Sequence, residues 1–169
     1  RPACSGANPG NARAGPGTAV GRGHGPVDWA LVRHAQKGSE VSDFWAGIRH
    51  FQRAEFRCPC GECSGYPVEP SEDLVRSLEE IREAWGQPMR INSGVRCVTW
   101  NAKVGGAADS AHLLGVAVDI SITNSTDRHE FLSFATAAFH RVGIAEDFIH
   151  VDCDSHRPAR VAWLYPRSK

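Results

Sequence analysis

Two histidines and two acids in the second half of the chain are spaced in a way that suits a catalytic metal. The segment 110–119 carries His112 and Asp119, and Asp147 and His150 follow further along. Neutral imidazoles and a carboxylate are ligands that zinc accepts, and three protein ligands leave a fourth position for water. Zinc makes such a water more acidic and polarises a carbonyl group, so this set suits hydrolysis.

The spacing alone supports only part of this interpretation. Gly115 lies between His112 and Asp119 and allows the chain to turn from a loop into a strand. Asp147 precedes His150 by three residues. It is the general base that we assign, because a carboxylate at the start of that strand can take a proton from water. Histidines also occur as packed or solvated residues, so the pattern leaves a structural role open.

A longer series of motifs runs through residues 50–165. It comprises Phe51-x-x-x-Glu55-Phe56-x-Cys58, Ile91-Asn92-Ser93-Gly94-Val95-Arg96-Cys97, Asn101-x-x-Val104-Gly105-Gly106, Ser110-x-His112-x-x-Gly115-x-Ala117-x-Asp119 and Asp147-Phe148-Ile149-His150-Val151-Asp152. This series resembles the M15 metallopeptidases, which include zinc D-Ala-D-Ala carboxypeptidases and phage peptidoglycan endopeptidases. The hedgehog signalling domain shares their fold.

The resemblance implies a role for each residue of the site. It implies that one zinc ion is bound by His112, Asp119 and His150, and that Asp147 is the catalytic acid/base. It also implies that Arg96 engages the substrate. The planar guanidinium suits a carboxylate clamp or a stabiliser of an oxyanion. Without the resemblance, an arginine at a strand end would be expected to form a surface ion pair.

Three further polar residues surround the motif. Ser110 fits a hydroxyl that contacts the substrate or orients a ligand, although a simple turn residue would look the same. Asp152 shares a strand face with His150, and we expect it to be a hydrogen-bond partner of that metal-binding ring; direct ligation and a solvated acid are the alternatives. Some relatives carry another histidine shortly before the catalytic acid. Here Glu146 precedes Asp147 and competes for the base assignment.

The function implied is that of a zinc-dependent D-alanyl-D-alanine carboxypeptidase, which hydrolyses peptidoglycan stem peptides by means of zinc-activated water. One alternative is a peptidoglycan endopeptidase that cuts inside the stem peptide or cross-bridge. Another is a non-catalytic, zinc-containing binding module, against which Asp147 argues because such a module needs no base. The stem peptide is the expected partner, and we expect an extracytoplasmic location, periplasmic or secreted.

A few helices and strands must position these residues. Helices are expected at residues 71–85 and 127–142, and strands at 88–93, 116–120, 148–152 and 160–164. Ser71 is a fitting N-cap for the first helix, and Gly86 ends it. Asp119 and His150 alternate with aliphatic residues and therefore face away from them. We expect an α+β fold, with a small, largely antiparallel sheet flanked by helices and the last strand beside the His150 strand.

The composition bounds the organisation of the chain. Its 169 residues suit one catalytic unit with an appendage: a Gly/Ala/Pro-rich N-terminal arm at 1–41 and a zinc peptidase domain at 42–169. Basic and acidic residues both total 19, so nothing favours nucleic acid or anionic lipid as a partner. No apolar run reaches the roughly 18 residues of a membrane span. We expect a monomer.

Six cysteines form an even set that suits disulfides in an oxidising compartment, and disulfides are what we expect. The close spacing of Cys58, Cys60 and Cys63, with Cys97 as a fourth thiol, also permits a structural metal site. Free thiols are the third alternative. One zinc per chain would support disulfides, and two would support a thiolate site.

Overall fold

The computed structural model describes residues 43–166, so the expected N-terminal arm at residues 1–41 lies outside the described residues. The elements in chain order are η2 (Asp43–Gly47), η3 (Arg53–Phe56), α1 (Glu72–Trp85), β1 (Ile91–Ser93), α2 (Val98–Lys103), η4 (Ala111–Leu114), β2 (Ala117–Ser121), α3 (Ser125–Ala138), β3 (Arg141–Ile144), β4 (Phe148–Asp152) and β5 (Val161–Leu164), where η denotes a 3-10 helix. Within this part of the chain no helix is long and apolar enough to cross a membrane.

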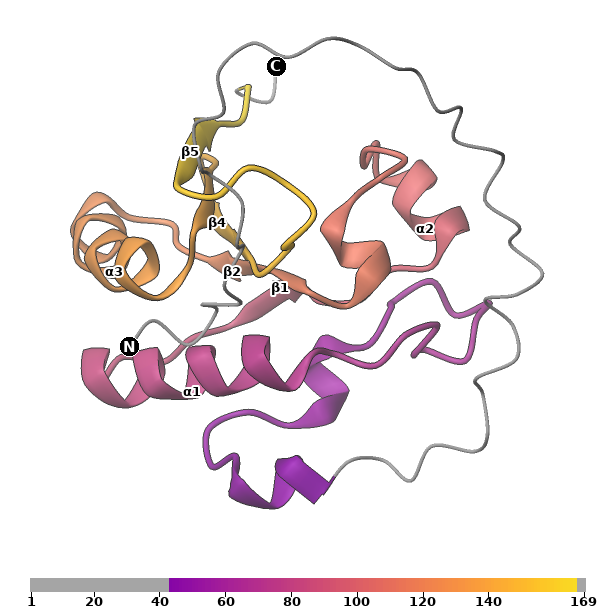
Figure 1. Cartoon of the computed structure of the whole chain (residues 1–169), viewed down its shortest axis with the longest axis horizontal. Helices are drawn as coiled ribbons and strands as arrows, with labels where there is room; N and C mark the ends of the chain where they lie inside the picture. The colour runs from indigo at the N-terminus through magenta and orange to yellow at the C-terminus, as the bar shows by residue number, and fades with distance from the viewer. Residues whose placement is uncertain (1–42, 167–169) are drawn as a thin grey trace, which may run out of the picture. The chain divides into compact units, whose positions relative to one another are not determined.

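The five strands form one sheet in the order β1-β2-β4-β3-β5. Three neighbouring pairs are antiparallel, and β3 and β5 are parallel. The expected α+β fold with a largely antiparallel sheet is therefore confirmed (Figure 1). The expectation that the last strand lies beside β4 is wrong: β2 and β3 occupy both edges of β4, and β5 pairs with β3 instead.

Helix α1 has the ends that its sequence predicts. Ser71 is the N-cap residue, and Gly86 follows the last turn with a φ of 75°, a left-handed conformation that glycine adopts without steric cost. Leu74 and Leu78 are almost fully buried on its inner face. The helix therefore forms one wall of the hydrophobic core.

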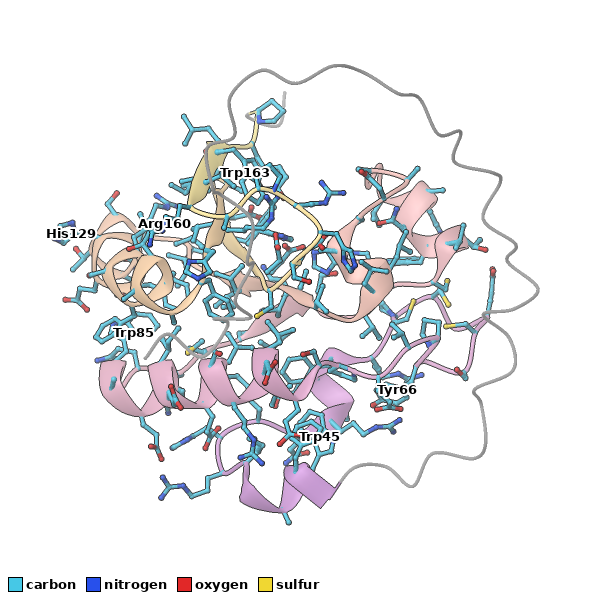
Figure 2. All side chains as sticks on the ribbon, viewed as in Figure 1. Trp45, Tyr66, Trp85, His129, Arg160 and Trp163 are labelled. Atoms are coloured by element: carbon cyan, nitrogen blue, oxygen red, sulfur yellow. The ribbon has the colours of Figure 1, made fainter. Side chains whose placement is uncertain are left out.

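The second long helix is shorter than expected. It ends at Ala138, and the following residues form strand β3, where Val142 and Ile144 pair with the apolar residues of β4. The predicted helix at 127–142 joined the apolar residues of α3 to Val142 in one helical stripe, but Val142 and Ile144 follow a strand period. Trp85, at the end of α1, packs against α3 and contacts Phe131 with ring centroids 5.4 Å apart (Figure 2).

The two faces of the central strands have different chemistry. Val118 and Ile149 are fully buried and pack with residues of α1 and α3 on one face of the sheet. Asp119 and His150 alternate with them and lie on the opposite face, where they are direct partners across the β2–β4 pair. One face thus builds the core, and the other carries the candidate site.

Candidate metal centre and active site

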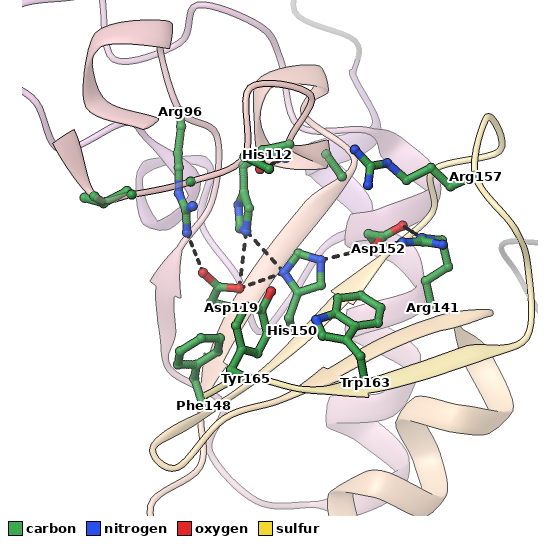
Figure 3. Close-up of a pocket in the computed structure, with 16 residues that line it drawn as sticks. Arg96, His112, Asp119, Arg141, Phe148, His150, Asp152, Arg157, Trp163 and Tyr165 are labelled. Carbon is green, nitrogen blue, oxygen red and sulfur yellow. Dashed lines mark hydrogen bonds and ion pairs between the residues drawn. The ribbon is translucent and has the colours of Figure 1, made fainter. Parts of the chain in front are cut away.

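Three expected ligands meet on the polar face of the sheet. His112 comes from η4, Asp119 from β2 and His150 from β4. The Oδ1 atom of Asp119 lies 2.8 Å from Nδ1 of His150 and 3.2 Å from Nε2 of His112, and the two nitrogens are 3.3 Å apart (Figure 3). All three side chains are buried. The fold therefore brings together residues that are up to 38 positions apart.

Backbone contacts fix the orientation of His112. The Oγ of Ser110 accepts a hydrogen bond from the backbone N–H of His112 at the start of η4, and Gly115 ends this turn with a φ of 72°. The Nδ1 of His112 lies 2.7 Å from the carbonyl oxygen of Gly94, which can only accept, so Nδ1 carries the proton. In the neutral ring the Nε2 lone pair is then free and faces Asp119.

Asp152 contacts the ring of His150 on the side away from the other candidate ligand atoms. Its Oδ2 atom lies 3.1 Å from Nε2 of His150, so the opposite nitrogen, Nδ1, faces the other ligand atoms. Arg141 donates from Nε to the same carboxylate at 2.9 Å. Asp152 is 1% exposed. It therefore occupies the expected position of a hydrogen-bond partner for the ring, and burial removes the solvated-acid alternative.

The charges at the centre are strongly coupled. Burial alone would raise the pKa of Asp119, but hydrogen bonds and charge from His112 and His150 outweigh it and hold this pKa well below its usual range. Burial would lower the pKa of His150, and the carboxylates of Asp119 and Asp152 raise it above the ordinary value. Asp119 is therefore an anion, which is the form in which a carboxyl group binds a metal ion.

The geometry fits zinc. Ligands at about 2.1 Å from a tetrahedral zinc ion lie about 3.4 Å from one another. The ligand atoms of His112, Asp119 and His150 all lie within 4.8 Å of one another, and their shortest separations are 2.8 to 3.3 Å. Two nitrogens and one carboxylate oxygen also match the donor types of zinc hydrolases. The three residues can therefore hold one zinc ion and leave a fourth position open.

Arg96 joins the centre through one ligand. Its Nη2 donates to Oδ2 of Asp119 at 2.6 Å, and its Nε donates to the hydroxyl of Ser93 at 2.8 Å. Its backbone N–H donates to the carbonyl of His112. Both the main chain and the side chain of Arg96 are thus fixed relative to the metal ligands.

The centre opens into a pocket of about 620 Å³, within the roughly 300 to 1,000 Å³ of small-molecule sites. Arg96, Ser110, His112, Asp119 and His150 all line it, together with Arg141 and Arg157. The expected metal ligands and both expected substrate-contacting residues therefore share one cavity.

Aromatic residues that sequence reasoning missed form one wall of this pocket. Trp163 and Tyr165 lie with ring centroids 5.4 and 6.4 Å from His150, and Phe148 packs beside Tyr165. The hydroxyl of Tyr165 points towards Asp119 and His150 in Figure 3. Burial and the negative charge of Asp119 raise the pKa of Tyr165, so the phenol stays protonated at neutral pH and can donate a hydrogen bond. The alternation Trp163-x-Tyr165 is the signal in the sequence that could have predicted both rings on one face of the strand.

The expected base does not line the pocket. Asp147 and Glu146 lie in the turn between β3 and β4, and both are exposed. The carbonyl oxygen of Asp147 accepts a hydrogen bond from the N–H of Ile122, which fixes the turn. The next residue, Phe148, is the first of this segment to line the cavity.

The disulfides expected from the cysteine count are absent among Cys58, Cys60, Cys63 and Cys97, which are free thiols. The sulfur atoms of Cys60 and Cys63 are 3.3 Å apart, far beyond the roughly 2.05 Å of a disulfide bond. The expectation of disulfides is therefore wrong for these four cysteines, and the structure favours the alternative of a thiolate cluster. Cys4 lies outside the described residues.

Two comparisons with known proteins agree with this geometry. The profile of the peptidase M15 family matches residues 49–152, which contain the three candidate ligands, Arg96 and Asp147. The chain is also 46% identical over 44 residues to the zinc D-Ala-D-Ala carboxypeptidase of Streptomyces albus G. That match covers 25% of this chain and 17% of the Streptomyces enzyme. Because the family profile spans more than half of the sequence, this chain belongs to the peptidase M15 family.

Proposed function

We propose that the chain is a zinc-dependent D-alanyl-D-alanine carboxypeptidase that hydrolyses peptidoglycan stem peptides. The observation that carries this proposal is the convergence of His112, Asp119 and His150 in a pocket that also holds Arg96. A zinc ion in such a set polarises a carbonyl group and lowers the pKa of water towards neutrality. The name of the Streptomyces relative supports the choice of substrate.

Arg96 would hold the substrate by its carboxylate. A guanidinium has five N–H donors, and the side-chain hydrogen bonds described for Arg96 use Nε and Nη2. The remaining donors are available to the terminal carboxylate of a stem peptide or to the oxyanion that develops during hydrolysis. Tyr165 would add a neutral donor from the opposite wall, because its raised pKa keeps the phenol protonated.

Proton transfer is assigned to Asp147. The spacing Asp147-x-x-His150 supports this assignment, and the carboxylate starts from an exposed turn directly before Phe148 of the pocket. Catalytic hydrogen bonds often tighten only when substrate is bound. Ser110 would orient His112, because its hydroxyl oxygen accepts a hydrogen bond from the backbone N–H of His112.

The test is release of free D-alanine from a peptide that ends in D-Ala-D-Ala. The protein is assayed as purified, after chelation, and after zinc is restored. We expect release that the chelator abolishes and zinc restores. Cleavage of cross-linked muropeptides without D-alanine release would replace the proposal with an endopeptidase, and zinc binding without hydrolysis of either substrate would replace it with a binding module.

The substrate also sets the expected location and assembly. Peptidoglycan lies outside the cytoplasm, so we propose an extracytoplasmic site of action, periplasmic or secreted. We also propose that the working unit is a monomer. Sedimentation of the active enzyme tests the assembly, and a dimer required for turnover would contradict it.

A further inference from the structure

Four sulfur atoms meet beside α2, outside the pocket described above (Figure 2). They belong to Cys58, Cys60 and Cys63 in the segment before α1 and to Cys97 at the N-cap of α2. All four lie within 4.8 Å of one another. Two separations are shorter, 3.3 Å between Cys60 and Cys63 and 3.7 Å between Cys60 and Cys97.

These distances distinguish between two kinds of thiol chemistry. A disulfide would require about 2.05 Å between two sulfur atoms. Four sulfurs bound to one zinc ion at about 2.3 Å in a tetrahedron lie about 3.8 Å from one another. The separations of 3.3 and 3.7 Å are therefore close to the edge of such a tetrahedron.

The backbone around the cluster supplies hydrogen bonds to every sulfur. Such donors stabilise thiolates, the form that binds metal, and orient the ligands. The donors are the N–H groups of Cys97 to Cys58 at 3.4 Å, Glu62 and Cys63 to Cys60 at 3.3 and 3.2 Å, Gly65 to Cys63 at 3.3 Å, and Trp100 to Cys97 at 3.3 Å. Gly65 has a φ of 87°, which a residue with a Cβ rarely adopts.

We propose that Cys58, Cys60, Cys63 and Cys97 bind one structural zinc ion, distinct from the ion of the active site. Four thiolates complete a tetrahedron and leave no position for water, which is the arrangement of a structural rather than a catalytic zinc. The proposal does not depend on the peptidase activity, because none of these cysteines lines the pocket.

The site would fasten two segments that are distant in sequence. Residues 58–65 have neither a helix nor a strand, and zinc would tie them to Cys97 at the start of α2. Cys97 directly follows Arg96, which donates to Asp119 of the catalytic set. The structural ion would thus hold in place the segment that positions Arg96, and its binding would contribute to folding.

Metal content and cobalt absorption of the full chain test the proposal. We expect about two zinc ions per chain, one for each ligand set. The variant that combines Cys60→Ser with Cys63→Ser should retain about one, and so should the matched control His112→Ala. With cobalt in place of zinc, wild type and His112→Ala should show the thiolate-to-cobalt charge-transfer band, because soft thiolates produce it. The double cysteine variant should lose it.

Three results would overturn the proposal. One is a wild-type chain with a single zinc ion that the cysteine substitutions do not change. Another is a cobalt-loaded wild type without the thiolate band, which is informative even if the cysteine variant fails to fold. The third is a disulfide between Cys60 and Cys63 in the zinc-loaded wild type, detected by mass spectrometry under non-reducing conditions. None of these readouts uses peptidase activity, so they separate this proposal from the proposed function.

Discussion

Replacing Asp152 with asparagine should weaken metal binding without removing a ligand. The carboxylate lies 3.1 Å from Nε2 of His150 and holds the ring so that Nδ1 faces the other ligand atoms. The substitution keeps the size of the side chain but removes its charge. A neutral amide stabilises the N–H of a metal-bound imidazole less than a carboxylate does, so the opposite nitrogen becomes a weaker ligand.

The magnitude follows from the contacts of this carboxylate. Loss of such a partner weakens metal affinity about tenfold to a hundredfold, or about 1.4 to 2.7 kcal/mol. The substitution also leaves Arg141 without its charged partner at 2.9 Å. Breaking a buried ion pair on one side costs about 3 to 5 kcal/mol, which sets an upper limit for the loss of folding stability.

The assay is competition for zinc against a chromophoric chelator, with urea unfolding measured separately. The matched control is Asp154→Asn, because Asp154 is buried nearby but bonds to Arg157 and to the backbone of His156 rather than to His150. We expect weaker zinc binding in Asp152→Asn than in the control. Equal zinc affinity in a folded Asp152→Asn protein would refute the role of this carboxylate.

Three further predictions concern the base, the sheet and the effect of pH. Asp147→Ala should abolish turnover with zinc still bound, whereas Glu146→Ala should keep it; wild-type turnover in Asp147→Ala would disprove the base assignment. Gly143→Ala should lower the free energy of unfolding by about 1 to 3 kcal/mol, because a Cβ there would lie 2.6 Å from the ring of Tyr165; urea unfolding with unchanged stability would contradict this. In the metal-free protein, the depressed pKa of the Asp119 carboxyl stabilises the fold at pH values above 3.8, the ordinary pKa of this group, and the stabilisation is lost as the pH falls below 3.8. If the free energy of unfolding of Asp119→Asn depends on pH in the same way as that of the wild type, Asp119 does not contribute this pH dependence.

The family resemblance, together with local patterns, explains why the grouping of the three candidate ligands could be predicted. The ligand motif is short around His112 and Asp119, and strand alternation alone places Asp119 and His150 opposite the aliphatic core residues. The ends of α1 were also predictable, because Ser71 and Gly86 act on neighbouring backbone groups.

Features that depend on distant parts of the chain were missed. Val142 continues the apolar stripe of α3 in sequence, and only its pairing with Val151 reveals a strand. The pairing of β5 depends on which edges of β4 are already occupied. The cysteine count could not separate bonded from clustered thiols, because the position of Cys97 relative to residues 58–63 is set by the tertiary fold.

Gly143 has a consequence for how this enzyme can be altered. It is the direct partner of His150 across the β3–β4 pair, and the space above its bare Cα is filled by the rings of Trp163 and Tyr165. The candidate metal ligands belong to η4, β2 and β4, whereas Trp163 and Tyr165 belong to the last strand and the residue after it. The segment that carries these two pocket-lining rings therefore contains none of the three candidate metal ligands. Libraries that vary residues 161–165 should change which peptide fits while the zinc affinity stays the same.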